Sequence, residues 1–290
     1  MLHLGKINSL TVQKTVDFGW YLYDGKNVRK NVLLPRKLYK GELKEGDKLD
    51  VFLYLDSEDR LVATPQIPKA QVGELALLRV KDVNRIGAFL DWGLDKDLLV
   101  PFREQPERMK INHSYLVYIY VDPVTRRIVA SRRLMHFFKG DVSELEPNQK
   151  VRLKVWEPAR LGWRVIVNEK YTGLIYSNEL YQPLNAGEDL EGYVHNVRIE
   201  TNQLDIRLRP DGIEGVRDFK STVLDALEDA GGYLPLSSKC DAAKIQEYFS
   251  FSKRVFKQVI GMLYKERKII IEEYGIRLNK EEKPQEKKKR

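Results

Sequence analysis

The chain has 290 residues, of which 42% are hydrophobic and 32% charged, and its formal net charge is +8. This length favours more than one domain, and no apolar run is long enough to cross a bilayer, which excludes a helical membrane protein. The N-terminal sequence MLHLGKINSL lacks the layout of a signal peptide, so we expect a cytoplasmic protein. The single cysteine, Cys240, excludes an intrachain disulfide, and the four scattered histidines show no metal-ligand spacing. We therefore expect no metal and no cofactor.

A hairpin pattern occurs three times along the chain. The copies read GWYLYDGKNVRKNVLLP (19–35), GAFLDWGLDKDLLVP (87–101) and GWRVIVNEKYTGLIY (162–176). Each is a β-rich run, a polar turn and a second β-rich run, which is typical of a β-hairpin. One strand-like run precedes each hairpin and two follow it, so each unit contains five short strands. Five strands in so small a unit favour closure into a barrel, and the OB-fold is the five-stranded barrel of this size.

The glycine that opens each hairpin is predicted to lie at a bulge where a barrel strand bends. In the second copy, strand alternation after Gly87 places Ala88 and Leu90 on one face and Phe89 on the other. If Ala88 and Leu90 fill the barrel, Phe89 points outward. The opposite parity, with Phe89 in the core, is the alternative.

The last quarter of the chain changes to helical spacing after Pro210. We expect a helix in VRDFKSTVLDALEDAGG, a short strand at YLPL and a short helix in SSKCDAAKIQEYF, with Ser237, Ser238 or Asp241 as its cap. The segment SFSKRVFKQVIGMLYKERK has the strongest helical periodicity, and KIIIEEYGIRLN reads as a hairpin that turns near 272–275. This order is that of a winged helix. The non-core side of its third helix carries basic residues that suit either nucleic acid or a solvated protein-interaction surface.

The fold class predicted from these patterns is multidomain and mainly β: three tandem five-stranded barrels followed by an α+β winged helix. The expected boundaries are 1–68, 69–140, 141–210 and 211–279, with a charged, disordered tail at 280–290. Residues 69–140 are the most basic folded part, with 13 Lys and Arg against 8 Asp and Glu. Such an excess is compatible with a polyanionic partner.

Two short segments resemble a known domain. GAFL (87–90) and GLIYSNEL (173–180) are similar to the first and second motifs of the S1 RNA-binding domain, an OB-fold. The whole of 1–279 resembles the conserved virulence factor B family of bacterial RNA-binding proteins, most closely in FSFSKRVFKQVIGMLYKERKI. This resemblance implies a cytoplasmic RNA-binding regulator with S1-type OB-fold domains and a C-terminal winged helix.

The S1 resemblance also implies which residues contact RNA. Aromatic residues just before and two after the glycine stack bases, while the residue that ends the third strand and a basic residue in the last strand hold the backbone. No copy is complete, because Pro35 and Pro101 end the third strands of the first two, and Ile86, Leu161 and Arg164 replace aromatics. The candidate RNA-binding residues are Phe18, Tyr21, Arg60, Arg85, Phe89, Arg126, Arg127, Arg132, Arg164, Tyr176, Arg207, Lys253, Arg254 and Lys257.

The leading hypothesis is a non-catalytic regulator of gene expression that binds single-stranded RNA with weak sequence preference. The alternative is a DNA-binding transcription regulator that acts through the winged helix, against which stand Glu272 and Glu273 in the wing. An enzyme is not expected, because acidic groups such as Asp56, Glu58 and Asp59 lie in predicted turns, where carboxylates are usually solvated. No membrane and no small-molecule substrate are expected as partners.

Overall fold

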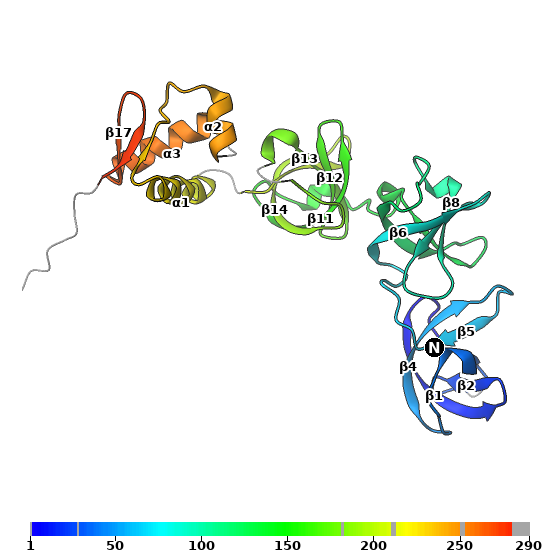
Figure 1. The fold of residues 1–290 in the computed structure, drawn as a ribbon. Helices are drawn as coiled ribbons and strands as arrows, with labels where there is room; N and C mark the ends of the chain where they lie inside the picture. Colours follow the sequence, from blue (N-terminus) through cyan, green and yellow to red (C-terminus); the bar gives the residue numbers. More distant parts are fainter. Residues whose placement is uncertain (1, 28, 181–182, 210–212, 250–252, 280–290) are drawn as a thin grey trace, which may run out of the picture.

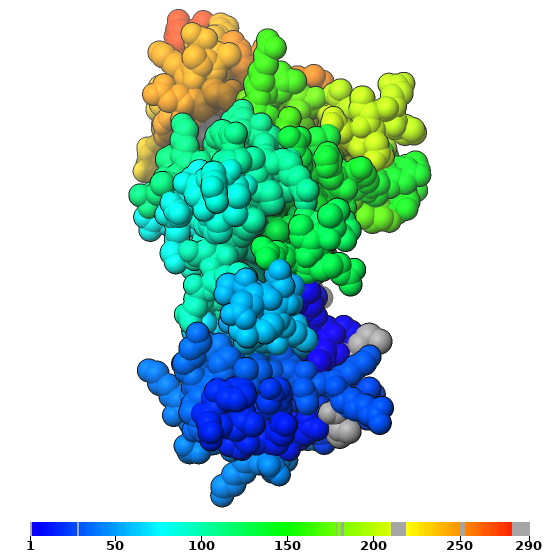
Figure 2. Space-filling model, turned by 90° about the vertical axis from the view of Figure 1, so that its right-hand side faces the viewer, coloured from blue at the N-terminus to red at the C-terminus, as the bar shows by residue number. Residues whose placement is uncertain are grey.

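The computed structural model describes residues 2–27, 29–180, 183–209, 213–249 and 253–279. The tail at 280–290, for which disorder was predicted, lies outside the described residues. Four units follow one another along the chain: three β-barrels and a helical unit (Figure 1). In Figure 2 the first barrel forms a separate lobe below the second. The predicted fold class, tandem OB-type barrels with a C-terminal winged helix, is confirmed.

Barrel 1 is a closed five-stranded barrel with the strand order β1-β2-β3-β5-β4. Its strands are β1 (Ile7–Val16), β2 (Gly19–Tyr23), β3 (Asn31–Pro35), β4 (Lys48–Leu55) and β5 (Leu61–Thr64). Alternation of side chains explains the closure: Trp20 and Leu22 fill the interior, while Tyr21 between them faces out. A short 3-10 helix, η1 (Arg36–Leu38), follows β3.

Barrel 3 repeats this topology as β11-β12-β13-β15-β14, again closed. Its strands are β11 (Lys150–Ala159), β12 (Gly162–Val167), β13 (Tyr171–Tyr176), β14 (Asp189–Arg198) and β15 (Gln203–Arg207), and the 3-10 helices η4 (Val142–Glu144) and η5 (Ser177–Glu179) flank them. The parallel pairing of β13 with β15 closes the barrel.

Barrel 2 has the same strand order but a different seam. It consists of β6 (Leu75–Val83), β7 (Gly87–Asp91), β8 (Leu98–Pro101), β9 (Ser114–Val121) and β10 (Ile128–Ser131), with the 3-10 helices η2 (Phe102–Glu104) and η3 (Leu134–His136). β8 and β10 lie next to each other, yet the sheet ends at these two strands. The buried Gln105 side chain donates from Nε2 to the Val100 carbonyl at 2.8 Å, which anchors the segment after η2 on β8.

The predicted parity of the second hairpin is confirmed. Ala88 and Leu90 are fully buried in barrel 2, and Phe89 lies on the outer side. The expected role of the glycine is wrong in one respect. The bulges lie on the preceding strand, between Val12 and Lys14 in barrel 1 and at the equivalent points of the other two barrels. Glycine is needed for close approach instead, because a Cβ at Gly19 would lie 2.1 Å from the Leu34 carbonyl oxygen.

The winged helix contains the predicted elements in the predicted order. They are α1 (Ile213–Asp229), β16 (Tyr233–Leu234), α2 (Ala242–Phe249), α3 (Lys253–Lys265), β17 (Ile269–Ile271) and β18 (Ile276–Leu278), and the sheet order is β16-β18-β17. Asp241 caps α2, since its Oδ1 accepts from the Ala243 N–H at 3.3 Å. The unit has its own core, which includes Phe219, Phe256 and Leu263.

Apolar contacts join consecutive barrels. Phe52 of β4 belongs to the core cluster of barrel 2 and packs edge-to-face on Trp92, with ring centroids 5.5 Å apart. Barrels 2 and 3 share a separate cluster, which consists of Leu116, Leu134, Phe138, Trp156 and Ile166. The barrels therefore contact one another through buried side chains. The surfaces that these side chains cover are not open to a ligand.

Candidate nucleic-acid interface

The three barrels present equivalent positions beside the hairpin glycine. Gly19, Gly87 and Gly162 pair with Pro35, Pro101 and Tyr176, respectively. In each barrel the residue after that partner donates its backbone N–H to the carbonyl of the residue before the glycine. The side chains just before the glycines, those of Phe18, Ile86 and Leu161, are 58%, 52% and 57% exposed. Each barrel thus presents an apolar side chain at the same surface position.

A second set of equivalent positions faces the bulged strand. Across this pair, Lys14 lies opposite Tyr21 in barrel 1, Asp82 opposite Phe89 in barrel 2 and Glu157 opposite Arg164 in barrel 3. The bulge residues themselves are Gln13, Lys81 and Trp156. A bulge re-aims its side chain, so these residues leave the regular alternation of the strand.

Barrel 1 carries the most complete aromatic surface, which we call the barrel 1 platform: Lys14, Phe18 and Tyr21. The Phe18 and Tyr21 rings meet edge-to-face with centroids 6.4 Å apart. The Lys14 ammonium lies 4.9 Å from the Tyr21 ring centroid. An exposed ring and an adjacent cation are suited to a stacked base and its phosphate.

Phe89 lies at the junction of barrels 1 and 2. It lines a cavity of about 130 Å³ together with Tyr54 of barrel 1 and Lys96 and Arg127 of barrel 2. Lys96 Nζ donates to the backbone carbonyls of Leu55 and Asp56 at 2.8 and 2.9 Å. Phe89 is only partly exposed. It lies in this cavity and not on the open outer face that the sequence predicted.

Arg127 links the same two barrels. Its guanidinium donates to both carboxylate oxygens of Asp59, at 2.7 and 2.8 Å. The Arg127 guanidinium lowers the pKa of the Asp59 carboxyl. Arg127 is therefore engaged within the protein, and its charge is neutralised locally.

Three other predicted arginines lie in exposed loops. Arg60 is held by Asp56 and Glu58 at 2.8 Å each, in the turn between β4 and β5. Arg85, between β6 and β7, and Arg126, in the turn between β9 and β10, are exposed. Their side chains form no hydrogen bond or ion pair with any residue that the structure describes. Of the three, Arg85 and Arg126 carry the accessible charge.

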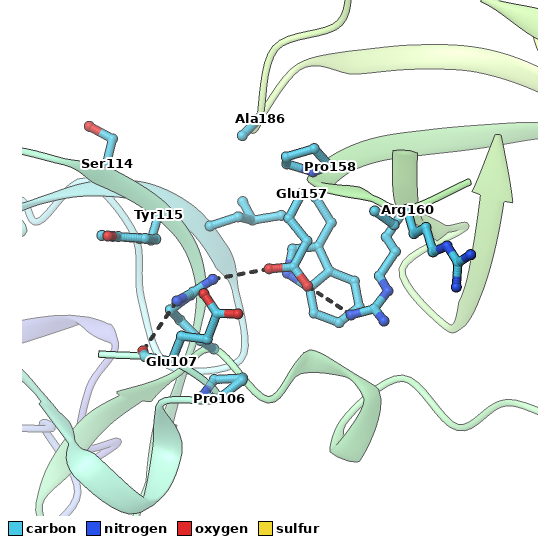
Figure 3. A pocket seen from close by; sticks show the side chains of 13 residues that line it. Pro106, Glu107, Ser114, Tyr115, Glu157, Pro158, Arg160 and Ala186 are labelled. Carbon is cyan, nitrogen blue, oxygen red and sulfur yellow. Dashed lines mark hydrogen bonds and ion pairs between the residues drawn. The ribbon is translucent and has the colours of Figure 1, made fainter. Parts of the chain in front are cut away.

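Arg132 does not lie on the open face expected from the sequence. It is 9% exposed, and its guanidinium stacks on the Tyr115 ring with 4.5 Å to the centroid. Its Nη2 donates to Glu157 Oε2 at 3.0 Å, and the other oxygen of Glu157 accepts from Arg164 Nη1 at 2.9 Å. Figure 3 shows the Glu157 carboxylate with an interaction on either side. The structure thus brings Arg132 and Arg164 together, but on one shared carboxylate.

The remaining predicted residues of barrel 3 form internal contacts. The Tyr176 hydroxyl accepts from Arg198 Nη2 at 2.7 Å and donates to Asp205 Oδ1 at 3.3 Å. Arg207 Nη2 contacts His195 Nε2 at 2.8 Å, and its Nε lies 3.7 Å from Glu179. The polar groups of Tyr176 and Arg207 are therefore engaged by other residues of barrel 3.

The basic residues of α3 are differently placed. Phe256, Val259, Ile260 and Leu263 bury one side of the helix, and Arg254 and Lys257 are exposed on the other. Lys253, Arg254 and Lys257 form no ion pair with any residue within the described part of the chain. The wing is more neutral, because Glu272 pairs with Arg277 at 2.6 Å and Glu273 with Lys239 at 3.2 Å. The helix therefore offers free positive charge that the wing does not.

Sequence reasoning missed Lys14, Trp156 and Arg160. Lys14 could have been found from its place opposite Tyr21, had the register been known. Trp156 stands in a strand whose alternation predicts a regular position, and no local signal marks the bulge that re-aims it. Arg160 is exposed beside the third glycine and lines the hollow between barrels 2 and 3.

Other kinds of site were searched in the described residues. They contain no group of three or more His, Cys, Asp and Glu side chains arranged to hold a metal ion. They also contain no helix long and apolar enough to cross a membrane. The acidic turn residues considered as possible catalysts are engaged by arginines: Asp56 and Glu58 by Arg60, and Asp59 by Arg127.

Comparison with known proteins identifies barrels 1 and 2 and the helical unit. The S1 domain model matches residues 4–66 and 72–131, and the model of the CvfB-like winged helix domain matches 221–278. The chain is 26% identical to conserved virulence factor B of Staphylococcus haemolyticus, over 82% of either chain. The chain thus resembles the conserved virulence factor B family in its domain types and over most of its length. The domain models and the relatives named conserved virulence factor B confirm the predicted resemblance to that family.

A second curated relative extends the sequence likeness to almost the whole chain. The uncharacterized protein YitL of Bacillus subtilis is 26% identical over 91% of this chain and 90% of its own length. A solved structure of a multidomain protein with nucleic acid binding domains, from Streptococcus pneumoniae, is 24% identical, covers 95% of this chain and 98% of its own, and superposes with a TM-score of 0.40. The two curated relatives thus match this chain over most of their own length.

Proposed function

We propose that the protein is a non-catalytic regulator of gene expression that binds single-stranded RNA. The observation that carries this proposal is the barrel 1 platform, where Phe18 is 58% exposed beside Tyr21 and Lys14. A large apolar ring that remains exposed on a folded surface indicates a binding site when other groups suited to the same ligand surround it. The winged helix cooperates through the free cations of α3.

The chemistry favours an unpaired strand over a duplex. Each aromatic face stacks a base for roughly 1–3 kcal/mol with little sequence preference, and this requires bases that are not already stacked in a helix. Lys14, Arg85 and Arg126 are suited to phosphates, whose neutralisation makes affinity fall with salt. We expect weak sequence preference, because the platform offers rings and a cation rather than base-edge hydrogen bonds.

The test is binding of a labelled single-stranded oligoribonucleotide to the full chain across a salt series. We expect Phe18→Ala and Tyr21→Ala each to weaken binding by about tenfold at constant salt, with the salt slope unchanged. The matched control is Ile199→Ala, which removes a side chain that is 70% exposed in the β14–β15 turn. Binding that resists salt, or that is equally reduced by the control, contradicts the proposal.

A second candidate function, duplex DNA binding by the winged helix, is favoured by one observation. Arg254 and Lys257 are exposed on α3 and unpaired among the described residues, as a recognition helix requires. Removal of both by alanine substitution is expected to reduce RNA affinity and lower the salt slope by about 2. If duplex DNA competes with RNA at equal or lower concentration, and this variant abolishes the competition, the DNA function is favoured instead.

The non-catalytic part of the proposal has its own test. Hydrolysis of RNA by metal ions requires ligands that converge on one point. We expect labelled RNA to stay intact when it is incubated with the full chain and Mg²⁺ or Mn²⁺. Cleavage products that grow with protein concentration and vanish with a chelator contradict it.

A further inference from the structure

The hollow between barrels 2 and 3, which we call the inter-barrel cleft, has a cavity volume of about 500 Å³. Pro106, Glu107 and Tyr115 line it from barrel 2, and Trp156, Glu157 and Arg160 line it from barrel 3 (Figure 3). This volume lies within the range of roughly 300–1,000 Å³ that small-molecule sites occupy. Glu157 and Arg164 belong to the equivalent positions described above, whereas the residues from barrel 2 are specific to this junction.

More arginines than carboxylates line the cleft, and two of these arginines pair with one carboxylate, that of Glu157. Arg132, Arg160 and Arg164 line it, against Glu107 and Glu157. The two oxygens of Glu157 each accept from a different guanidinium, that of Arg132 at 3.0 Å and that of Arg164 at 2.9 Å. A phosphate also has several oxygens and can accept from two guanidinium groups at once. Glu157 therefore occupies a site that suits an anion of a ligand.

An unpaired buried donor also lies at this junction. Trp156 is 4% exposed, and its indole Nε1 has no hydrogen-bond partner among the described residues. Leaving a buried N–H unpaired is unfavourable, so this donor suits an acceptor that a ligand supplies. Arg164 stacks over the Trp156 ring, 5.4 Å from its centroid, and is itself 48% exposed. Its outer face is available for a base, since guanidinium planes stack on bases in RNA complexes.

We propose that the inter-barrel cleft binds one nucleotide of the RNA strand, with Glu157 as the internal competitor of its phosphate. The proposal rests on the RNA-binding function proposed above. In the bound state, Arg160 and Arg164 contact the phosphate, the base stacks on Arg164, and the Trp156 N–H donates to an oxygen of the nucleotide. Glu157 keeps its bond to the buried Arg132, which therefore stays paired.

The geometry favours a strand over an isolated nucleotide. A second hollow, of about 240 Å³, shares Trp156, Arg160 and Arg164 with the cleft and continues over Leu161 and Leu174 on barrel 3. Leu161 occupies the position of Phe18 in the barrel 1 platform. The cleft thus opens onto the surface along which an S1-type strand would run.

The first experiment compares two charge-matched variants of the full chain. Glu157→Gln frees Arg164 and is expected to tighten binding of a fluorescein-labelled oligouridylate by about threefold. The control, Glu144→Gln, removes the same charge from barrel 3, where Glu144 pairs with Lys170 on another surface. The control is expected to change affinity by less than the test variant. Equal effects of the two variants overturn the proposal.

The second experiment reads the site directly. Binding of the oligouridylate is expected to change tryptophan emission, and Trp156→Phe is expected to remove most of that change and weaken binding by about threefold. An unchanged emission response in Trp156→Phe overturns the proposal even if the variant is less stable, because a purely structural Trp156 contributes no response to RNA.

Free uridine monophosphate separates the two sources of a nucleotide phosphate. We expect it to bind weakly, to be strengthened by Glu157→Gln, and to be displaced by the oligouridylate. If it binds the cleft and the oligouridylate does not displace it, the strand assignment is overturned and the cleft is a site for free nucleotides. If the chain binds no RNA at all, the proposed function fails, and the uridine monophosphate measurement still reports on the cleft alone.

Discussion

In barrel 1 the positions beside the hairpin glycine hold two aromatic rings and a lysine, whereas barrel 3 holds Leu161, Arg164 and Glu157 there. The backbone is the same: both barrels close through a parallel strand pair, and both carry a bulge at the same place. The surface chemistry differs, since the lysine of barrel 1 contacts a ring and the arginine of barrel 3 contacts a carboxylate. A common fold thus fixes where a ligand can lie and leaves its recognition to a few outward positions.

The bulge residue extends this comparison. In barrel 1 it is Gln13, whose side-chain oxygen accepts from Asn31 Nδ2 at 2.9 Å within the same barrel. In barrel 3 it is Trp156, which belongs to the apolar cluster shared with barrel 2. The bulge residue therefore makes a contact within its own barrel in barrel 1 and a contact with the neighbouring barrel in barrel 3. Barrel 3 uses its bulge for assembly, and the inter-barrel cleft follows from that use.

The strongest test that barrels 1 and 3 share one backbone conformation is substitution of the hairpin glycines. Gly19 and Gly162 have φ values of +153° and +154°, and a Cβ would lie 2.1 and 1.9 Å from the opposite carbonyl oxygens. Alanine at either position is expected to destabilise its own barrel by about 3 kcal/mol, from backbone strain and steric overlap. Hydrogen exchange resolved by barrel measures the loss.

The control for this pair is Gly261→Ala in α3, where a Cβ meets nothing within 4 Å. It is expected to stabilise the winged helix by about 0.5–1 kcal/mol, because alanine is the better helix former. If only one of the two barrel variants is destabilised, the glycines do not share a role and the equivalence of the barrels is wrong.

Most of the fold was predictable because its signals are local and repeated. The three hairpins, the parity of Ala88, Phe89 and Leu90, and the order of elements in the winged helix depend on alternation and helical spacing. The open seam of barrel 2 was not predictable, since barrels 1 and 3 have the same strand order and hairpin pattern and yet close. The sequence predicts the bulges at the glycines, whereas they lie on the preceding strand. A glycine can be seen in the sequence, but a shift in the pairing register cannot.

The candidate residues were harder to predict, because partners determine what a charged side chain can do. Arg127 and Arg132 are both basic residues near one strand, but their partners, Asp59 and Glu157, lie in neighbouring barrels. Sequence spacing contains no information on contacts between barrels. The residues of α3 were placed correctly on the non-core side because their exposure depends only on helical periodicity.

A smaller effect tests the internal network of barrel 3. Tyr176 ends β13 where Pro35 ends β3, and its hydroxyl lies between Arg198 and Asp205. We expect Tyr176→Phe to cost about 1 kcal/mol of unfolding free energy, while RNA affinity changes by less than about twofold. Chemical denaturation and RNA titration of the same variant measure the two effects. A large loss of affinity with unchanged stability places Tyr176 on the RNA path.

The smallest expected effect concerns the ion pair that joins barrels 1 and 2. Arg127 lowers the pKa of Asp59 below its ordinary 3.8, so this contact stabilises the junction above that pH and is lost as pH falls through the lowered value. Both side chains are about half exposed, at 50% and 51%, so solvent and salt weaken the pair. The emission of Trp92 reports on this junction and is obtained as the difference between the chain and its Trp92→Phe variant. We expect this emission to change weakly as the pH falls below about 4. Asp59→Asn should remove this titration, while Asp141→Asn, which alters an acid of lowered pKa in barrel 3, should leave it intact. An unchanged titration in Asp59→Asn means that another acid is responsible and that the Asp59–Arg127 pair does not affect the Phe52–Trp92 packing.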